Sequence, residues 1–162
     1  IKDAALFEKI AGYADDAELL ADIDSVVATC CAIKARIVEQ DEFDTGLRML
    51  LNFGHTLGHA VEQHFGYSCF THGEGVAIGM YQLTKRTEEL GMTAKGSAER
   101  IKSVLEKYNL PLTAGVEKAQ LLDTMARDKK KNGNSITLII LQQIGEGVLQ
   151  KVDWQEVPKY LG

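Results

Sequence analysis

The segment from Arg48 to Glu62 carries a stripe of polar side chains along one side of an otherwise apolar helical pattern. At about 100° per residue, the turn of an α-helix, these polar side chains fall within a sector roughly 80° wide. They are Arg48, Asn52, His55, His59 and Glu62. Apolar residues occupy much of the remaining circumference, so the segment predicts a buried helix whose polar stripe faces a ligand, a metal or a partner.

Taken one at a time, these polar residues have ordinary structural interpretations. A single histidine on an apolar helix is usually a hydrogen-bonded core residue, and an arginine with a glutamate is usually an ion pair. Two histidines four residues apart, in register with an asparagine and an arginine, favour a ligand-binding role instead. Gly54 and Gly58 add to this, because glycine costs about 1 kcal/mol against alanine inside a helix. Their presence indicates that another backbone approaches closely.

Composition limits the class of protein. A chain of 162 residues with 45% hydrophobic and 25% charged residues is long enough for one domain with a core. The net charge of −5 argues against a general nucleic-acid surface, and no apolar run approaches the ~20 residues that span a bilayer. There is no signal-peptide pattern, and the three cysteines form neither a disulfide framework nor a zinc-spaced pair. We therefore expect a cytoplasmic protein with reduced thiols.

Hydrophobic periodicity predicts one mainly α-helical domain over residues 1–162, with a small β-hairpin near the C-terminus. The predicted helices cover residues 4–11, 16–22, 24–38, 48–66, 76–90, 97–108 and 116–128. The helix over 24–38 is expected to start at a cap on Asp24 or Ser25 and to turn its apolar side chains inward, namely Val26, Val27, Cys30, Ile33 and Val38. The hairpin joins 135–141 to 147–152 through Gly145.

The histidines suggest a metal site. Two histidines four residues apart on a helix can both bind zinc, and a third ligand with an open position would make the site catalytic. Spacing alone makes His55 and His59 the candidate pair. His72, at the expected start of the helix over 76–90, is the candidate third imidazole, and its alternative role is packing or capping at that helix start. A metalloprotease of the H-E-x-x-H type is disfavoured, because Thr56 follows His55.

Other residues near the stripe suit an anionic or polyhydroxylated substrate. Arg48 offers a planar fork of donors, and Asn52 offers a donor together with an acceptor. Lys34 could add an ammonium group, although a single lysine in such a helix is more often a surface side chain. The basic run over 128–133 is typical of a solvated loop and could also close over a phosphate.

Two stretches carry a resemblance to a known family. Residues 46–62, GLRMLLNFGHTLGHAVE, and residues 72–80, HGEGVAIGM, closely resemble the C-terminal helical domain of the 3-dehydroquinate synthase family. The similarity extends from Ile1 and Lys2 through residues 128–130 to the hairpin. It implies the multi-helical fold of that domain and the activity of a carbon-oxygen lyase in aromatic amino acid biosynthesis. This shikimate-pathway enzyme converts 3-deoxy-D-arabino-heptulosonate 7-phosphate to 3-dehydroquinate and phosphate.

The resemblance also implies cofactors and an assembly. The family uses NAD and a divalent metal, zinc or cobalt. The resemblance also suggests that the complete protein is a homodimer. NAD transiently oxidises a ring hydroxyl, which acidifies the neighbouring proton. Phosphate is then eliminated, the ketone is reduced back, and ring opening and an intramolecular aldol step close the carbocycle. The family's NAD-binding α/β domain and its third metal ligand, a glutamate, lie before the position of Ile1, so we expect this chain to be a fragment without turnover of its own.

Carried over by position, the resemblance makes His55 and His72 the metal ligands and gives His59 a role at the substrate. This replaces the pair that spacing alone suggests. The resemblance assigns catalytic roles to Lys34, Arg48, Asn52 and His59. It assigns substrate contacts to the same four residues together with Lys2 and one of Lys129 and Lys130. Asp44 matches the acidic residue that orders the substrate-binding arginine, where the longer glutamate is more usual.

Three alternatives remain open. Another sugar-phosphate cyclase, such as 2-deoxy-scyllo-inosose synthase, and an iron-dependent alcohol or glycerol dehydrogenase share the two-domain plan and the metal histidines. The run from Gly46 to His59 favours 3-dehydroquinate synthase over the dehydrogenases, which lack the arginine and the asparagine. The third alternative is a non-catalytic metal-binding or interaction module. A nucleotide-binding α/β domain that ends in a glutamate just before Ile1 would support an enzyme.

Overall fold

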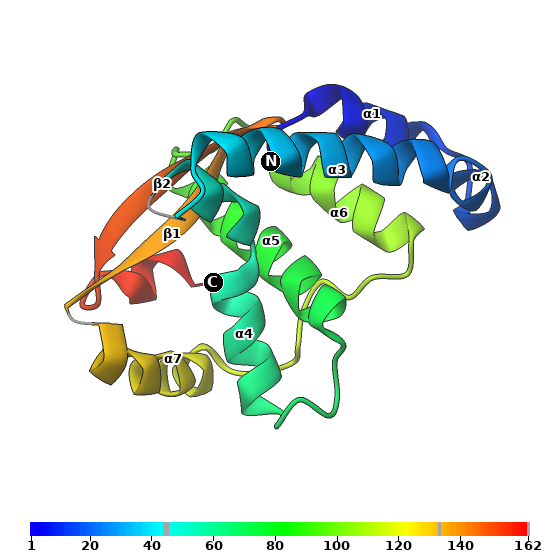
Figure 1. Cartoon of the computed structure of the whole chain (residues 1–162). Coiled ribbons are helices and arrows are strands. Elements are labelled where there is room, and N and C mark those ends of the chain that lie inside the picture. The colour runs from blue at the N-terminus through cyan, green and yellow to red at the C-terminus, as the bar shows by residue number, and fades with distance from the viewer. Residues whose placement is uncertain (44–45, 133, 162) are drawn as a thin grey trace.

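The computed structural model describes residues 1–43, 46–132 and 134–161, of which the side chains of 127–132 lie outside the description. This part of the chain is mainly helical and includes a two-stranded antiparallel hairpin, as the periodicity predicts. In Figure 1, α1, α2 and α3 lie along one side, α4 and α5 run through the middle, and the hairpin and α7 lie at the other side. The elements are α1 (Ala4–Gly12), α2 (Asp16–Ala21), α3 (Ile23–Gln40), η1 (Leu47–Asn52), α4 (His55–His64), α5 (His72–Glu89), α6 (Ser97–Lys107), α7 (Lys118–Asn132), β1 (Ser135–Gln143), β2 (Glu146–Asp153) and η2 (Val157–Tyr160).

Strand β1 lies between two hydrophobic clusters. Its buried residues alternate, so that positions 138 and 140 pack with Leu57 of α4, while positions 139 and 141 pack with Phe53 and with Ile101 of α6. A strand that is buried on both faces gives a continuous apolar run in the sequence. The hairpin that this run predicts is confirmed, with its turn at Gly145. No helix among the described residues has both the length and the hydropathy needed to cross a membrane.

Helices α4 and α5 pack with their backbones in contact. A Cβ atom on Gly58 would lie 2.8 Å from the carbonyl oxygen of Gly75, and one on Gly79 would overlap the carbonyl oxygen of Gly54. A side chain at either position would force the two helices apart. The close backbone approach predicted from Gly54 and Gly58 is confirmed. It places His72, the first residue of α5, beside α4.

The polar-striped segment is not one continuous helix, and this prediction was wrong. Leu47–Asn52 forms the short 3-10 helix η1, the chain turns at Phe53 and Gly54, and α4 begins at His55. Gly54 has a φ of +82°, a left-handed conformation that glycine adopts without steric cost. Because of this turn, η1 and α4 run along different axes, and the stripe is divided between them.

The predicted inward face of α3 was also partly wrong. The helix begins at Ile23, and Val26 and Ile37 are its buried residues. Val27 lies about 100° further around the helix and is 51% exposed. Cys30 is exposed as well, although it shares the side of Val26, because it borders an open cleft. The pattern failed because α3 packs along one narrow side only.

The last turn of α6 holds α1 in place, and α1 forms one wall of that cleft. The ammonium group of Lys107 donates hydrogen bonds to the carbonyl oxygens of Ala11 and Tyr13, at 2.5 and 2.6 Å. The Tyr108 hydroxyl donates to the carbonyl oxygen of Ile10 at 2.7 Å. These bonds satisfy carbonyl groups that the end of a helix leaves without partners.

Candidate metal and substrate site

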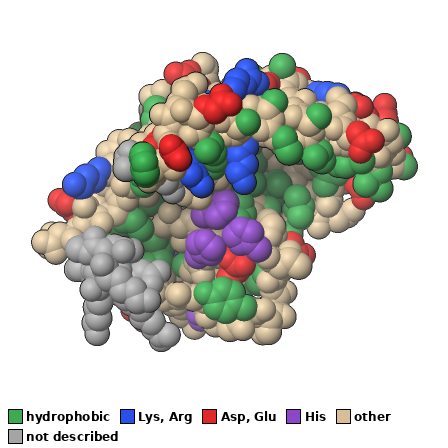
Figure 2. Space-filling model, viewed as in Figure 1, with side chains coloured by type: hydrophobic (Ala, Val, Ile, Leu, Met, Phe, Trp, Pro, Cys, Tyr) green, Lys and Arg blue, Asp and Glu red, His purple; other side chains and the backbone are tan. Residues whose placement is uncertain are grey.

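Three of the chain's four histidines meet where α4 and α5 begin. His55 and His59 lie one turn apart on α4, and His72 opens α5, where Thr71 and Glu74 form a capping box. The ring centroids are 5.0 Å apart for His55 and His72, 5.4 Å for His59 and His72, and 5.6 Å for His55 and His59. Figure 2 shows these imidazoles gathered near the centre of the visible face, below lysine and arginine side chains. The structure therefore brings all three candidate histidines together.

The ring of His55 is oriented by the backbone. Its Nδ1 lies 3.3 Å from the carbonyl oxygen of Phe53, so Nδ1–H is the donor in this bond and Nε2 is the atom left for a ligand. Burial lowers the pKa of His55, the neighbouring His72 and His59 lower it as well, and the Phe53 carbonyl opposes them. A neutral imidazole with an unprotonated Nε2 is the form that binds a metal.

The carboxylate of Glu62 forms hydrogen bonds with the other two imidazoles, those of His59 and His72. Its side chain is 7% exposed, whereas those of His59 and His72 are each 55% exposed. One carboxylate oxygen, Oε2, lies 3.0 Å from Nδ1 of His59 and 3.3 Å from Nδ1 of His72, and Oε1 also lies 3.3 Å from the latter. With both Nδ1 atoms donating to Glu62, the two Nε2 atoms are available on the exposed side.

The donor set fits a divalent metal. Imidazole nitrogens are common ligands of zinc and related divalent metals, and hydrogen bonds from Nδ1 to a carbonyl or carboxylate are the usual support for such ligands. His55 and His72 both have this support, from Phe53 and Glu62. His59, Glu62 and His72 also place one donor atom each within 4.8 Å of one another, so direct coordination by Glu62 is the competing arrangement.

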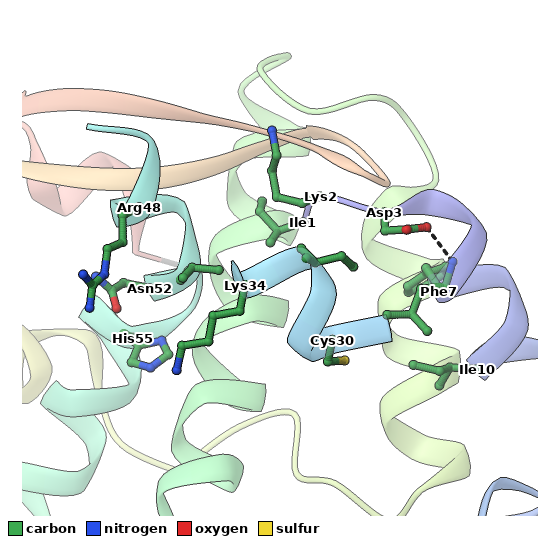
Figure 3. Close-up of a pocket in the computed structure, with 13 residues that line it drawn as sticks. Ile1, Lys2, Asp3, Phe7, Ile10, Cys30, Lys34, Arg48, Asn52 and His55 are labelled. Carbon is green, nitrogen blue, oxygen red and sulfur yellow. Dashed lines mark hydrogen bonds between the residues drawn. The ribbon is translucent and has the colours of Figure 1, made fainter. Parts of the chain in front are cut away.

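A cleft of about 630 Å³ opens beside His55 and brings together most of the predicted substrate residues. In Figure 3 the side chains of Lys34 from α3, Arg48 and Asn52 from η1, and His55 from α4 converge on one region. Lys2 also borders the cleft, but its ammonium group extends away from the other four (Figure 3). With η1 and α4 separated by the turn at Phe53 and Gly54, Arg48 and Asn52 line the same cleft as His55.

Asp41 fixes the start of η1. Its Oδ2 accepts hydrogen bonds from the backbone N–H groups of Gly46 and Arg48, at 2.8 and 2.9 Å. The guanidinium of Arg48 donates from Nη1 to the carbonyl oxygen of Glu42 at 2.9 Å. These bonds hold Arg48 at the edge of the cleft. Asp44, which the resemblance matches to an arginine-orienting residue, lies outside the described residues.

His59 faces a second hollow, of about 400 Å³, between α4, α7 and the hairpin. Thr56, Met125 and Trp154 line it, and the Nε1 atom of Trp154 is buried without a hydrogen-bond partner among the described residues. The sequence contained no signal for this hollow or for the place of Cys30 in the larger cleft. Lys129 and Lys130 belong to the last turns of α7, and their side chains lie outside the description.

The chain is similar to named proteins over its whole length. A protein of Clostridium acetobutylicum named 3-dehydroquinate synthase is 46% identical over 162 residues, which are 99% of this chain and 46% of that protein. One from Enterococcus faecalis with the same name is 36% identical, over 99% of this chain and 45% of its own length. The chain thus spans less than half the length of these relatives.

Solved structures share the fold. A 2-epi-5-epi-valiolone synthase from Streptomyces hygroscopicus, with NAD⁺ and Zn²⁺ bound, superposes with a TM-score of 0.76 at 20% identity, over 99% of this chain and 46% of that one. A 2-deoxy-scyllo-inosose synthase complexed with carbaglucose-6-phosphate, NAD⁺ and Co²⁺ gives 0.71 at 19% identity, over 86% and 40%. The family model described as 3-dehydroquinate synthase C-terminal matches residues 1–131. With most of its length matched, the chain belongs to the 3-dehydroquinate synthase C-terminal family.

Proposed function

We propose that this chain is the metal- and substrate-binding part of a 3-dehydroquinate synthase, which converts 3-deoxy-D-arabino-heptulosonate 7-phosphate to 3-dehydroquinate and phosphate. One observation carries the proposal: His55 belongs both to the imidazole cluster and to the lining of the cleft that Lys34, Arg48 and Asn52 share. A metal on the imidazoles would therefore lie next to groups suited to an anionic, polyhydroxylated substrate. The names of the relatives support this choice of reaction.

The cofactor roles follow from the donor atoms. His55 and His72 would hold Zn²⁺ or Co²⁺ through Nε2, because their Nδ1 atoms are directed to Phe53 and Glu62. The bound metal would polarise substrate oxygens, and NAD would accept a hydride and return it. As part of the same proposal, an NAD-binding α/β domain and a third, glutamate ligand precede residue 1, and the complete enzyme is a cytoplasmic homodimer.

The side chains around the cleft would bind and orient the substrate. The fork of Arg48 and the ammonium of Lys34 would hold its phosphate and carboxylate, and the amide of Asn52 would bind a hydroxyl. His59 would move a proton at Nε2, since its Nδ1 donates to Glu62. Lys2 and one of Lys129 and Lys130 complete the proposed set of substrate contacts.

The test uses the full-length protein with 3-deoxy-D-arabino-heptulosonate 7-phosphate, NAD and Co²⁺ or Zn²⁺. Formation of 3-dehydroquinate with an equal amount of phosphate is expected, and omitting NAD or dialysing against a chelator should abolish it. Turnover of glucose 6-phosphate in its place would indicate a 2-deoxy-scyllo-inosose synthase. Accumulation of NADH with glycerol or an alcohol would indicate a dehydrogenase, and metal binding without any turnover would indicate a non-catalytic module.

The proposed glutamate ligand before residue 1 can be tested separately. Removing one anionic ligand leaves two neutral imidazoles, so the 162-residue chain should bind Co²⁺ more weakly than the full-length protein does. Titrating both with Co²⁺ measures the difference. Equal affinities would place the third ligand inside this chain. Glu62, which groups with His59 and His72, would be the first candidate, and Glu74, held by its bonds to Thr71, the second.

A further inference from the structure

We infer that Glu62 is a positioning residue that orients His59 and His72 together, so that one carboxylate supports both the metal ligand and the proton-transfer histidine. The inference rests on the proposed function. A single oxygen, Oε2, lies within 3.3 Å of Nδ1 on both rings, although the rings come from different helices. Glu62 therefore connects α4 to the first residue of α5.

The position of Glu62 is set by packing. A Cβ atom on Gly75 of α5 would lie 3.1 Å from Cγ of Glu62. The side chain of Glu62 therefore occupies the space that a larger residue at position 75 would need. A buried carboxylate is stable only when hydrogen bonds replace its lost hydration. The two imidazole N–H groups supply these bonds. The carboxylate thus lies between two imidazoles, with its side chain packed against Gly75.

Glu74, the other glutamate close to His72, has a different task. It accepts hydrogen bonds from the backbone N–H and the hydroxyl of Thr71, both at 2.8 Å, and completes the capping box of α5. Glutamine serves in a capping box as well as glutamate does. Glu74→Gln is therefore a matched control, because it removes a carboxylate near the cluster and keeps the helix start.

The effect on the metal is expected to be large. A carboxylate that accepts Nδ1–H of a metal-bound histidine fixes the tautomer and direction of the ring, and its loss typically costs about 10- to 100-fold in metal affinity. In Glu62→Gln the amide oxygen can still accept hydrogen bonds from the imidazoles, but it carries no full charge, so both bonds are weaker. The Co²⁺ dissociation constant of the full-length protein should rise by roughly 10- to 100-fold. The visible absorption bands of bound Co²⁺ should also shift, and Glu74→Gln should match wild type in both.

A double-mutant comparison separates the two roles. Because Glu62 acts on the metal through His72, the loss of Co²⁺ affinity in Glu62→Gln should persist in a His59→Ala background. Because it acts on proton transfer through His59, Glu62→Gln should lower kcat at saturating Co²⁺ when His59 is present, and it should not lower the residual kcat of His59→Ala any further. A carboxylate that only stabilised the fold would change both measurements alike in the two backgrounds.

Several outcomes would overturn the inference. Unchanged affinity and spectrum in Glu62→Gln would reduce Glu62 to a packing residue. Failure to reach one Co²⁺ per chain at any concentration, with His55→Ala still loading fully, would make Glu62 a direct ligand. If Glu62→Gln does not fold by circular dichroism, Glu62→Asp is measured instead, and the shorter reach should weaken Co²⁺ binding in the same direction. A wild-type protein that binds Co²⁺ without turnover would contradict the proposed function and leave the affinity test of Glu62 intact.

Discussion

Replacing Gly79 by alanine should destabilise the domain, although alanine is the better helix former. In a solvent-exposed helix, replacing glycine by alanine would stabilise the fold by about 1 kcal/mol. Here the new Cβ would overlap the carbonyl oxygen of Gly54, and it would lie 2.9 Å from the carbonyl carbon of Gly54 and 3.0 Å from the backbone nitrogen of Gly58. Overpacking a core typically costs about 1–3 kcal/mol. We take the upper end of this range, because the three nearest atoms all belong to the backbone and cannot rotate away as a side chain could. The net loss is about 2 kcal/mol, or roughly 4–8 °C in Tm for a domain of this size.

Urea denaturation of the 162-residue chain measures this loss, with Trp154 as the only tryptophan and so the only source of indole fluorescence. Gly73→Ala, in the first turn of the same helix, is the matched control, because its Cβ would meet nothing within 4 Å. It should be neutral or up to about 1 kcal/mol more stable. Co²⁺ affinity should fall in Gly79→Ala, since displacing α5 from α4 moves His72 away from His55. If Gly79→Ala unfolds at the wild-type urea midpoint, the backbone contact does not determine how these helices pack.

In the full-length protein, His55→Ala should lose metal, whereas His59→Ala should keep one metal per chain and lose turnover. Metal analysis alongside kcat decides this, and metal loss in both would restore the pair of ligands four residues apart. Arg48→Lys keeps the charge but not the fork, so kcat/KM should fall by the equivalent of about 2–5 kcal/mol, nearer the lower value in an open cleft, with metal content unchanged. Unchanged kcat/KM would make Arg48 a structural residue. Cys30 borders the cleft, whereas its exposed neighbour Cys31 does not line it. The sugar-acid phosphate should therefore slow alkylation of Cys30 by N-ethylmaleimide, as peptide mass mapping can show, and equal slowing at both thiols would refute this placement.

Local features of the sequence were sufficient for most of the elements. The helix over Ser97–Lys107 and the hairpin on either side of Gly145 follow from apolar spacing and turn residues that act over a few positions. The place of His72 at a helix start likewise follows from the turn-rich residues before it and is confirmed. The close approach of a second backbone could also be predicted from the sequence. Two glycines four residues apart weaken a helix, and the usual reason for them is that a neighbouring segment occupies the space that side chains would fill.

The break at Gly54 was decided by tertiary structure. The residues from Arg48 to Glu62 fit a single helical period, and nothing in that period shows that the chain changes direction. In the fold, α5 passes so close that Gly54 and Gly79 meet backbone to backbone, and Gly54 takes a left-handed conformation there. Arg48 and Asn52 therefore line the cleft beside His55, and His55 and His59 meet His72 at the start of α5.

Tertiary structure also determined which residues of the site lie next to one another. Periodicity could relate His55 to His59 and His59 to Glu62, because these residues share one helix. It could not relate Glu62 to His72, ten residues further along the chain, or place Lys34 of α3 beside His55. Such pairings depend on how helices pack, and helix packing is determined by contacts between surfaces that come from separate segments of the chain.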